Sequence, residues 1–281
     1  MSTRDIPTLR RLAAELRLHA FRAMGPNKPH HFGGSLSAAD IVTALYFYKM
    51  RYDPRNVAWP ERDRFLMSKG HCVPAQYAAL AMLGVLPLEE LATLKRLGTR
   101  LQGHPAMHET PGLEGCTGSL GQGLSYANGM ALAGRLRGLN YRVYCLIGDG
   151  ELHEGQIWEA ALTTSSRCLG NVTAIVDFNG LKAMDACACS RVMEPMAARW
   201  AAFGWRTREI DGHDMAQLCD ALDWAETDPR VPAVIIAHTV KGKGVSFMEG
   251  KAQFHNAAIT EDQHKQGLAE LEAALKALQE G

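Results

Sequence analysis

Short apolar runs alternate with amphipathic stretches through the second half of the chain. Two of these runs, residues 143–147 and 172–176, are rich in β-branched residues, as is typical of strands buried on both faces of a parallel sheet. Between them, apolar residues in the stretch from Glu154 to Ser166 recur at helical spacing. The pattern predicts a strand, a loop, a helix and a second strand, joined as a right-handed crossover.

The same alternation predicts an α/β fold for the whole chain, with a three-layer, mostly parallel sheet flanked by helices. Strands are expected near 142–147, 172–178, 205–210 and 232–238. Helices are expected near 6–24, 37–50, 73–83, 87–97, 123–137, 155–167, 194–203 and 214–226. A Thr260-x-x-Gln263 capping box predicts a C-terminal helix from about residue 260. No repeat or low-complexity linker interrupts the pattern, so residues 1–281 are expected to form a single domain.

Polar residues follow the two best-defined strands at the point where each ends. Gly148-Asp149-Gly150 follows the first strand, and Asn179 follows the second. The carboxyl ends of parallel strands are the ligand-binding edge of an open α/β sheet. A carboxylate, an amide oxygen and a backbone carbonyl near Leu181 would suit Mg²⁺, which takes its remaining ligands from bound phosphates. The glycines let the backbone approach such a ligand closely.

Composition narrows the function classes. The chain has 281 residues, of which 47% are hydrophobic and 21% are charged, with 30 basic and 30 acidic side chains. No basic block is present, so we expect neither a nucleic-acid partner nor a membrane partner. The amphipathic N-terminus differs from a secretory signal, which favours a cytoplasmic location. The seven cysteines are expected to be reduced thiols, and the pair Cys187 and Cys189 lacks the further ligands that a metal site would need.

The motifs of the chain, taken in order, resemble the N-terminal, thiamine-diphosphate-binding part of transketolases from about residue 10 to about residue 260. A Gly-Asp-Gly motif alone would be weak evidence, but the ordered series is specific. The matching segments are 31–37 (HFGGSLS), 63–71 (DRFLMSKGH), 103–105 (GHP), 117–123 (TGSLGQG), 148–155 (GDGELHEG), 194–195 (EP), 211–214 (DGHD), 241–244 (KGKG) and His255. The family usually has Pro after the first histidine, where this chain has Phe32.

The resemblance implies a fold, a cofactor and a partner. Family transketolases are roughly twice as long, and the domains that follow this one carry the pocket for the aminopyrimidine ring and a glutamate that activates the cofactor. The chain is therefore expected to be the N-terminal subunit of a split transketolase that requires a C-terminal partner subunit. Two copies of each chain would mirror the family dimer. The implied cofactors are thiamine diphosphate and Mg²⁺, with Ca²⁺ or Mn²⁺ as substitutes, and the substrates are sugars or sugar phosphates.

The resemblance also assigns roles to residues. It places four histidines around the reactive ring and the sugar: His104 at the donor carbonyl, His31 and His255 at the hydroxyl that loses its proton, and His71 at a diphosphate oxygen. Histidine suits proton shuttling because its ordinary pKa lies near neutrality. The neighbouring His30 leaves the register of the first motif open by one residue.

Other motif residues have an ordinary interpretation beside the one that the resemblance implies. Glu154 and Glu159 could be first-turn acids that favour a helix dipole. In transketolases the matching acids connect the two active sites across the interface between subunits. Residues Gly118, Ser119 and Leu120 could be a helix entry, or could line the cofactor pocket.

Three alternatives share the metal motif. They are the α subunit of a 2-oxoacid dehydrogenase, a protein similar to deoxyxylulose-phosphate synthase, and a non-catalytic remnant that binds diphosphates. The four-histidine pattern disfavours the first two, and intact Asp149 and Asn179 disfavour the third. The choice of ketose donor and aldose acceptor stays open, because in the family much of the sugar-phosphate site lies in the later domains.

Overall fold

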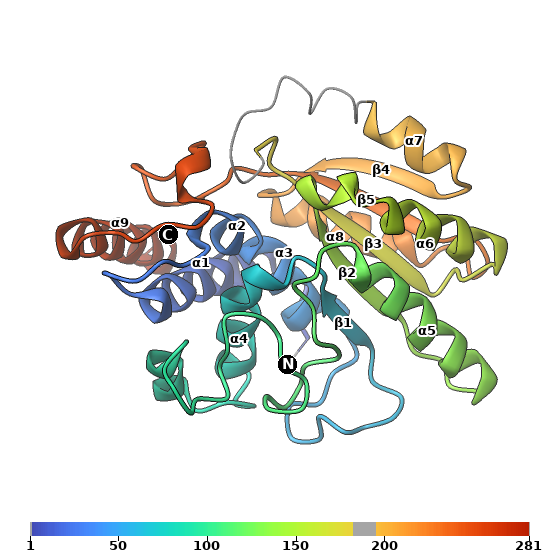
Figure 1. Cartoon of the computed structure of the whole chain (residues 1–281), viewed down its shortest axis with the longest axis horizontal. Coiled ribbons are helices and arrows are strands. Elements are labelled where there is room, and N and C mark those ends of the chain that lie inside the picture. Colours follow the sequence, from blue (N-terminus) through green and yellow to red (C-terminus); the bar gives the residue numbers. More distant parts are fainter. Residues whose placement is uncertain (1, 182–194, 281) are drawn as a thin grey trace.

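A parallel sheet forms the centre of the chain in the computed structural model, which describes residues 2–181 and 195–280. In the described residues the strand order is β1-β2-β3-β5-β4, with every neighbouring pair parallel (Figure 1). The strands are β1 Arg64–Met67, β2 Val143–Gly148, β3 Val172–Phe178, β4 Arg206–Asp211 and β5 Ala233–His238. Helices cover both faces of the sheet, so the three-layer α/β prediction is confirmed.

The two faces of the sheet are filled by alternate residues of the same strands. In β2, Tyr144 and Leu146 join one core cluster, whereas Val143, Cys145 and Ile147 join the other. Such strands are apolar at every position because both faces are buried. The first cluster is completed by α1 Ile6–Met24, α3 Ala39–Ala44, α4 Val73–Met82 and α8 Met215–Ala225, and the second by α5 Gln122–Leu136, α6 Gly155–Ser166 and α7 Met196–Ala202.

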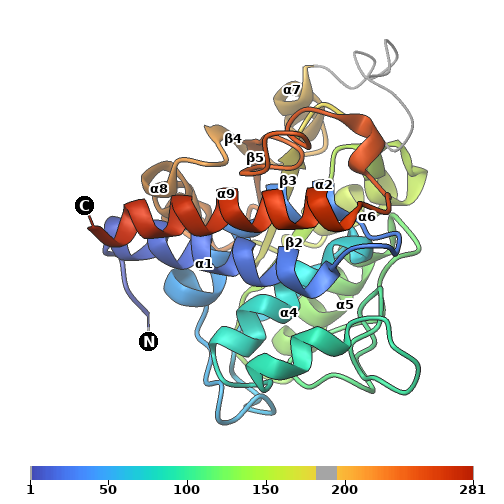
Figure 2. The same ribbon diagram turned by 90° about the vertical axis from the view of Figure 1, so that its left-hand side faces the viewer.

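The C-terminal helix α9, Glu261–Glu280, lies along α1 (Figure 2). Its predicted capping box is present: the Thr260 N–H donates to Gln263 Oε1 at 3.0 Å, and the Gln263 N–H donates to Thr260 Oγ1 at 3.1 Å. Among the described helices, none combines the length and apolar character needed to span a bilayer.

Three predicted elements need correction. The predicted strands omit β1, because four residues between charged side chains give too short an apolar run to stand out. The predicted helix at 37–50 is instead α2 Phe32–Ser37, α3 and a π-helical turn, Leu45–Lys49. The predicted helix at 87–97 is a 3₁₀ turn, Leu88–Thr93, that ends before Lys95, whose φ is 59°.

The early start of α2 shows why sequence propensity failed there. Gly33 and Gly34 are weak helix formers, yet both are buried and helical. A Cβ on Gly33 would lie 2.7 Å from Lys241 Cγ, and one on Gly34 would lie 2.5 Å from Cys72 Sγ. Tertiary packing therefore determines this helix. Residue 194 of the predicted 194–203 helix lies outside the described residues, as do Cys187 and Cys189. The five other cysteines form no disulfide.

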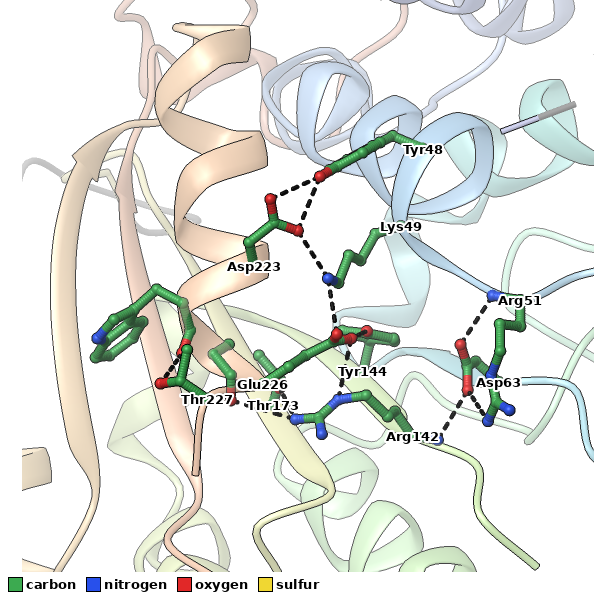
Figure 3. A network of polar contacts seen from close by, with 12 residues as sticks. Tyr48, Lys49, Arg51, Asp63, Arg142, Tyr144, Thr173, Asp223, Glu226 and Thr227 are labelled. Atoms are coloured by element: carbon green, nitrogen blue, oxygen red, sulfur yellow. Dashed lines mark hydrogen bonds and ion pairs between the residues drawn. The ribbon is translucent and has the colours of Figure 1, made fainter. Parts of the chain in front are cut away.

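A network of charged side chains ties together the amino ends of the strands (Figure 3). Lys49 lies between Asp223 and Glu226, with its Nζ 2.8 Å from an oxygen of each. Asp63 accepts hydrogen bonds from the backbone N–H groups of Arg51 and Arg142 at 2.8 and 2.9 Å. These contacts join the turn after α3, the end of α8 and the starts of β1 and β2. The opposite edge, where the strands end, carries the predicted ligands.

Backbone segments at that opposite edge approach one another closely. The 3₁₀ turn Gly70–Cys72, which carries His71, follows β1 and packs on the backbone of Thr117 and Gly118. A Cβ on Gly70 would lie 2.6 Å from both the carbonyl carbon and the oxygen of Thr117. Only glycine allows this contact without displacing one of the two segments.

We predict that Gly70→Ala destabilises the chain by about 1–3 kcal/mol, because the added methyl group overpacks a backbone contact. Urea unfolding followed by circular dichroism measures the effect. Gly129→Ala is the matched control: Gly129 lies within α5 and a Cβ there meets nothing within 4 Å. Its helix propensity should rise, so the control should be neutral or stabilising by up to about 1 kcal/mol. Equal stability of the Gly70→Ala variant and the parent would contradict the packing argument.

Candidate active site

A cavity of about 200 Å³ opens at the carboxyl ends of β1, β2 and β3. Loops after each strand supply its walls, which agrees with the general position of ligand sites in open α/β sheets. It is lined by the predicted metal ligands Asp149, Asn179 and Leu181, by the glycines Gly148 and Gly150, and by the basic side chains of Lys69, His71, Lys241 and His255.

The predicted metal ligands converge on this cavity from β2 and β3. Asp149 follows β2, and its two carboxylate oxygens accept hydrogen bonds from the backbone N–H groups of Gly150 at 2.7 Å and Gly180 at 2.6 Å. Asn179 follows β3, and its Oδ1 accepts from the Leu181 N–H at 3.2 Å. The pairing of Gly148 with the facing residue of β3 keeps the two strand ends level. The sheet register therefore brings these oxygens together.

The electrostatics of Asp149 suit a bound cation. Burial, followed by the nearby Asp177 carboxylate, raises the pKa of the Asp149 carboxyl to about 6. A cation would offset both effects by stabilising the charged form. Among the described residues, no three His, Cys, Asp or Glu side chains form a metal site by themselves. One carboxylate, one amide and one carbonyl thus fit a hard cation that completes its shell with phosphate oxygens and water.

A buried ion pair lies directly behind the cavity. The ammonium group of Lys69 contacts the Asp177 carboxylate, and both side chains are almost wholly buried. Lys69 Nζ also donates to the Gly34 carbonyl at 3.0 Å, while Ser37 Oγ donates to Asp177 at 2.6 Å. Burial alone would raise the pKa of Asp177, but Lys69 holds it below the ordinary value. The pair is therefore charged, and it fixes α2 to the ends of β1 and β3.

Lys241 is the second lysine of the cavity. Its Nζ donates to the Leu181 carbonyl at 3.0 Å and lies 3.1 Å from His255 Nδ1. Burial lowers the pKa of Lys241, although the Asp149 carboxylate opposes that shift. Lys241 lines the same cavity as Asp149, so its side chain can contribute positive charge toward a bound anion.

Glu151, which directly follows Gly148-Asp149-Gly150, is a buried acid. Its carboxylate accepts hydrogen bonds from the N–H groups of Gly121 at 2.8 Å and Gly148 at 3.1 Å, and from Ser68 Oγ at 2.5 Å. It thereby joins the loop before α5, the end of β2 and the end of β1. Burial raises the pKa of Glu151 above its ordinary value.

Four histidines from separate loops form a cluster beside the cavity. The ring of His31 lies 4.7 Å from that of His71, 5.4 Å from that of His255 and 6.2 Å from that of His104, measured between centroids. The rings of His71 and His255 are 5.0 Å apart. His30 is instead buried against the ring of Phe32, so His31 is the member of this histidine pair that joins the cluster.

The histidine cluster is neutral at physiological pH. Burial, followed by the neighbouring imidazoles, lowers the pKa of His31 to about 4. Burial, followed by neighbouring rings and Lys69, lowers the pKa of His71 to about 2. Burial, followed by Lys241 and Lys69, lowers the pKa of His255 to about 4. Burial also lowers the pKa of His104, the most exposed member. Neutral imidazoles can accept a proton or donate a hydrogen bond, as a proton-transfer site requires.

The remaining predicted residues divide into two groups. Leu120 lines the cavity, and Gly118, at a φ of 130°, lies so close to the His104 ring that a Cβ would clash with it. Ser119, Glu154 and Glu159 are exposed to solvent and are not among the residues that line the cavity. Their predicted roles therefore stay predictions.

The sequence argument did not assign four residues that the structure places at the site: Lys69, Glu151, Asp177 and Lys241. Lys69 and Lys241 lie inside the motif segments 63–71 and 241–244, so their position next to motif residues could have identified them as candidates for the site. Asp177 was detectable as an acid within an otherwise apolar strand. Glu151 gave no signal that separates it from Glu154, because only the fold decides which acid is buried.

We predict that acidification destabilises the chain through these histidines. His71 has a folded-state pKa far below the ordinary value of 6.5, so its unfolded form binds a proton first as the pH falls below that value. Stability present above pH 6.5 is then lost as the pH falls. A His71→Asn variant should lose about 1 kcal/mol less than the parent between about pH 7 and 5.5 in urea unfolding. Identical pH dependence in the two proteins would contradict the neutral cluster.

Comparison with known proteins agrees with the geometry. A sequence profile of the family described as "Transketolase, thiamine diphosphate binding domain" matches residues 8–271. The 6-deoxy-6-sulfo-D-fructose transketolase subunit SqwG of Clostridium sp. (strain MSTE9) is 47% identical over 242 residues, which cover 86% of this chain and 88% of that protein. One of the subunits of an apulose-4-phosphate transketolase from Phocaeicola vulgatus is 40% identical over 252 residues, covering 90% of this chain and 89% of that protein.

Solved structures give the same result. A transketolase from Campylobacter jejuni superposes with a TM-score of 0.84 at 27% identity, covering 99% of this chain and 46% of that one. This chain thus spans most of the length of the two subunit relatives and less than half of that transketolase. By its matching profile, relatives and fold, the chain belongs to the transketolase family and corresponds to its N-terminal, thiamine-diphosphate-binding part.

Proposed function

We propose that this chain is the diphosphate-binding subunit of a two-subunit transketolase. With a C-terminal partner subunit it would transfer a two-carbon ketol unit from a ketose or ketose phosphate to an aldose or aldose phosphate. The observation that carries the proposal is the neutral histidine cluster beside a cavity that holds a metal-type oxygen set and two lysines. A protein that only binds diphosphates would need the cavity with its oxygen ligands and lysines, but not the histidine cluster.

The cavity residues would hold thiamine diphosphate through its charged end. Asp149, Asn179 and the Leu181 carbonyl would bind Mg²⁺, with Ca²⁺ or Mn²⁺ as substitutes, and the metal would bind diphosphate oxygens. Lys241 and His71 would contact the diphosphate directly. Glycines at positions 148 and 150 permit close backbone approach. The cofactor, when bound, supplies the electron sink that the carbon–carbon bond cleavage needs.

The histidines would handle protons and orientation. Cleavage of the donor between C2 and C3 removes a proton from the C3 hydroxyl, and His31 and His255 are placed to accept it as neutral imidazoles. The acceptor aldehyde oxygen gains a proton when the new bond forms, which the same pair can return. His104, the most exposed of the four, would donate a hydrogen bond to the donor carbonyl.

A partner chain completes this proposal. The names of two relatives, SqwG and the Phocaeicola vulgatus protein, describe subunits of transketolases, and this chain is similar to nearly their whole length. The partner would supply the pyrimidine pocket and an activating glutamate, and two copies of each chain would form a heterotetramer. Glu154 and Glu159, both exposed in this chain, would meet their counterparts where two copies of the chain pack together.

We predict that Asp149→Asn abolishes Mg²⁺-dependent binding of thiamine diphosphate without unfolding the chain. Asparagine keeps one of the two hydrogen bonds that the carboxylate accepts from the Gly150 and Gly180 N–H groups, and it removes a charge that burial and the nearby Asp177 disfavour. These two effects oppose each other, so without ligand the stability of the variant should stay within about 1 kcal/mol of that of the parent. Thermal unfolding with and without the cofactor and Mg²⁺ measures both effects. A cofactor-induced stabilisation equal to that of the parent would remove Asp149 from the site.

The split arrangement is tested by assay. Purified chain with thiamine diphosphate, Mg²⁺ and a ketose–aldose pair should transfer no ketol unit above background, and addition of the C-terminal partner should restore transfer. Ketol transfer by the chain without a second polypeptide would disprove the need for a partner. Cofactor binding without transfer in the complete complex would instead favour the non-catalytic alternative.

A further inference from the structure

The Asp211-Gly212-His213-Asp214 motif has no place in the chemistry described above, yet the structure gives each member a contact. Asp211 Oδ1 accepts the His213 N–H at 2.8 Å, and the Gly212 N–H donates to the His238 carbonyl at 2.8 Å. A Cβ on Gly212 would lie 2.5 Å from Thr239 Cγ2. Asp214 caps α8 by accepting the Ala216 N–H at 2.9 Å. These contacts hold the His213 side chain against the segment that follows β5.

His213 bridges two elements through both ring nitrogens. Its Nδ1 lies 2.7 Å from Asp40 Oδ2, and its Nε2 accepts the Val240 N–H at 2.8 Å. Because Nε2 accepts, the neutral ring must carry its proton on Nδ1 and donate it to Asp40. Asp40 is buried, but Arg17 and His213 hold its pKa below the ordinary value, so it stays a carboxylate. The carboxylate therefore fixes the tautomer that can receive Val240.

Val240 immediately precedes Lys241, the lysine of the diphosphate cavity. Backbone hydrogen bonds hold the segment on either side: the Thr239 N–H donates to the Phe178 carbonyl at 3.0 Å, and the Gly242 N–H donates to the Gly33 carbonyl at 2.9 Å. Between these anchors, the Val240 N–H is received by a side chain, that of His213. This bond holds the backbone of the residue that precedes Lys241, and the Lys241 carbonyl accepts the Gly250 N–H at 2.9 Å.

We propose that His213 is a positioning residue for the diphosphate site, acting through Val240 on Lys241. The relay runs from Asp40 through the imidazole to the backbone N–H, and it ends at a Lys241 ammonium group that reaches Leu181 and His255. The inference rests on the proposed function, because it assigns Lys241 to the cofactor diphosphate. It gives a role to a motif histidine that does not itself line the cavity.

Two substitutions separate positioning from general stability. In His213→Asn the side-chain amide nitrogen falls near the place of Nδ1, so it can still donate to Asp40 but is too short to reach Val240. In His213→Gln the amide oxygen reaches the place of Nε2 and can still accept the Val240 N–H. Calorimetry of the full chain with thiamine diphosphate and Mg²⁺ should show about tenfold weaker binding for the asparagine variant and less than about threefold for the glutamine variant.

A double-mutant cycle with Lys241→Met tests whether the effect passes through Lys241. If it does, His213→Asn should weaken cofactor binding less than about twofold once Lys241 is removed, because the pair is coupled. His238→Asn is the matched control, since His238 ends β5 nearby but is exposed and pairs with Glu209. That control should bind the cofactor as tightly as the parent.

Each outcome decides a different claim. Failure of the unmodified chain to bind the cofactor with Mg²⁺, both alone and in complex with its C-terminal partner, would remove the proposed site and the inference with it. Tight binding by the parent and the asparagine variant alike would overturn the inference alone. Equal weakening by both His213 variants, together with lowered thermal stability of both, would show a purely structural role and would also overturn it.

Discussion

The buried ion pair between Lys69 and Asp177 is the interaction on which the site depends. It joins the ends of β1 and β3, which are separated by β2, and through Gly34 and Ser37 it also holds α2. Removing one partner of such a pair leaves an unpaired buried charge and typically costs about 3–5 kcal/mol. The pair therefore does more than add stability. It also fixes the positions of two histidines of the cluster, His31 just before α2 and His71 just after Lys69.

This pair also sets the charge balance of the cavity. Asp177 is neutralised by Lys69, whereas the carboxylate of Asp149 and the ammonium group of Lys241 both line the cavity. A metal and a diphosphate carry opposite charges and need such a divided site. The histidines stay neutral beside it because burial and positive neighbours disfavour their protonation. Under the proposed function, anion binding and proton transfer would therefore use separate side chains within one site.

The sequence predicted the parts of the structure that depend on local pattern. Strands β2, β3 and β5 follow from apolar runs, and β4 follows from the alternation of strands with helices. The convergence of Asp149 with Asn179 follows from the geometry of parallel sheets. Strand β1 and the start of α2 were missed, because β1 is too short to stand out and tertiary packing around Gly33 and Gly34 overrides propensity in α2. Among several acids, only the fold shows that Glu151 is the buried one. Residue type and spacing identify candidate chemistry, whereas burial selects among the candidates.

The two ends of the sheet show how such a site can be polar without weakening the fold. At the amino ends, Lys49 and Arg142 each form an ion pair with Glu226, and Asp63 accepts a hydrogen bond from the Arg142 backbone N–H (Figure 3). At the carboxyl ends, Asp149, Lys69 and Lys241 also have partners within the chain, but they line an open cavity and the neutral histidine rings lie beside it. A cavity with a few convergent polar groups is the usual form of a ligand site. The cavity therefore distinguishes the carboxyl ends of the strands from the amino ends and makes them the end suited to ligand binding.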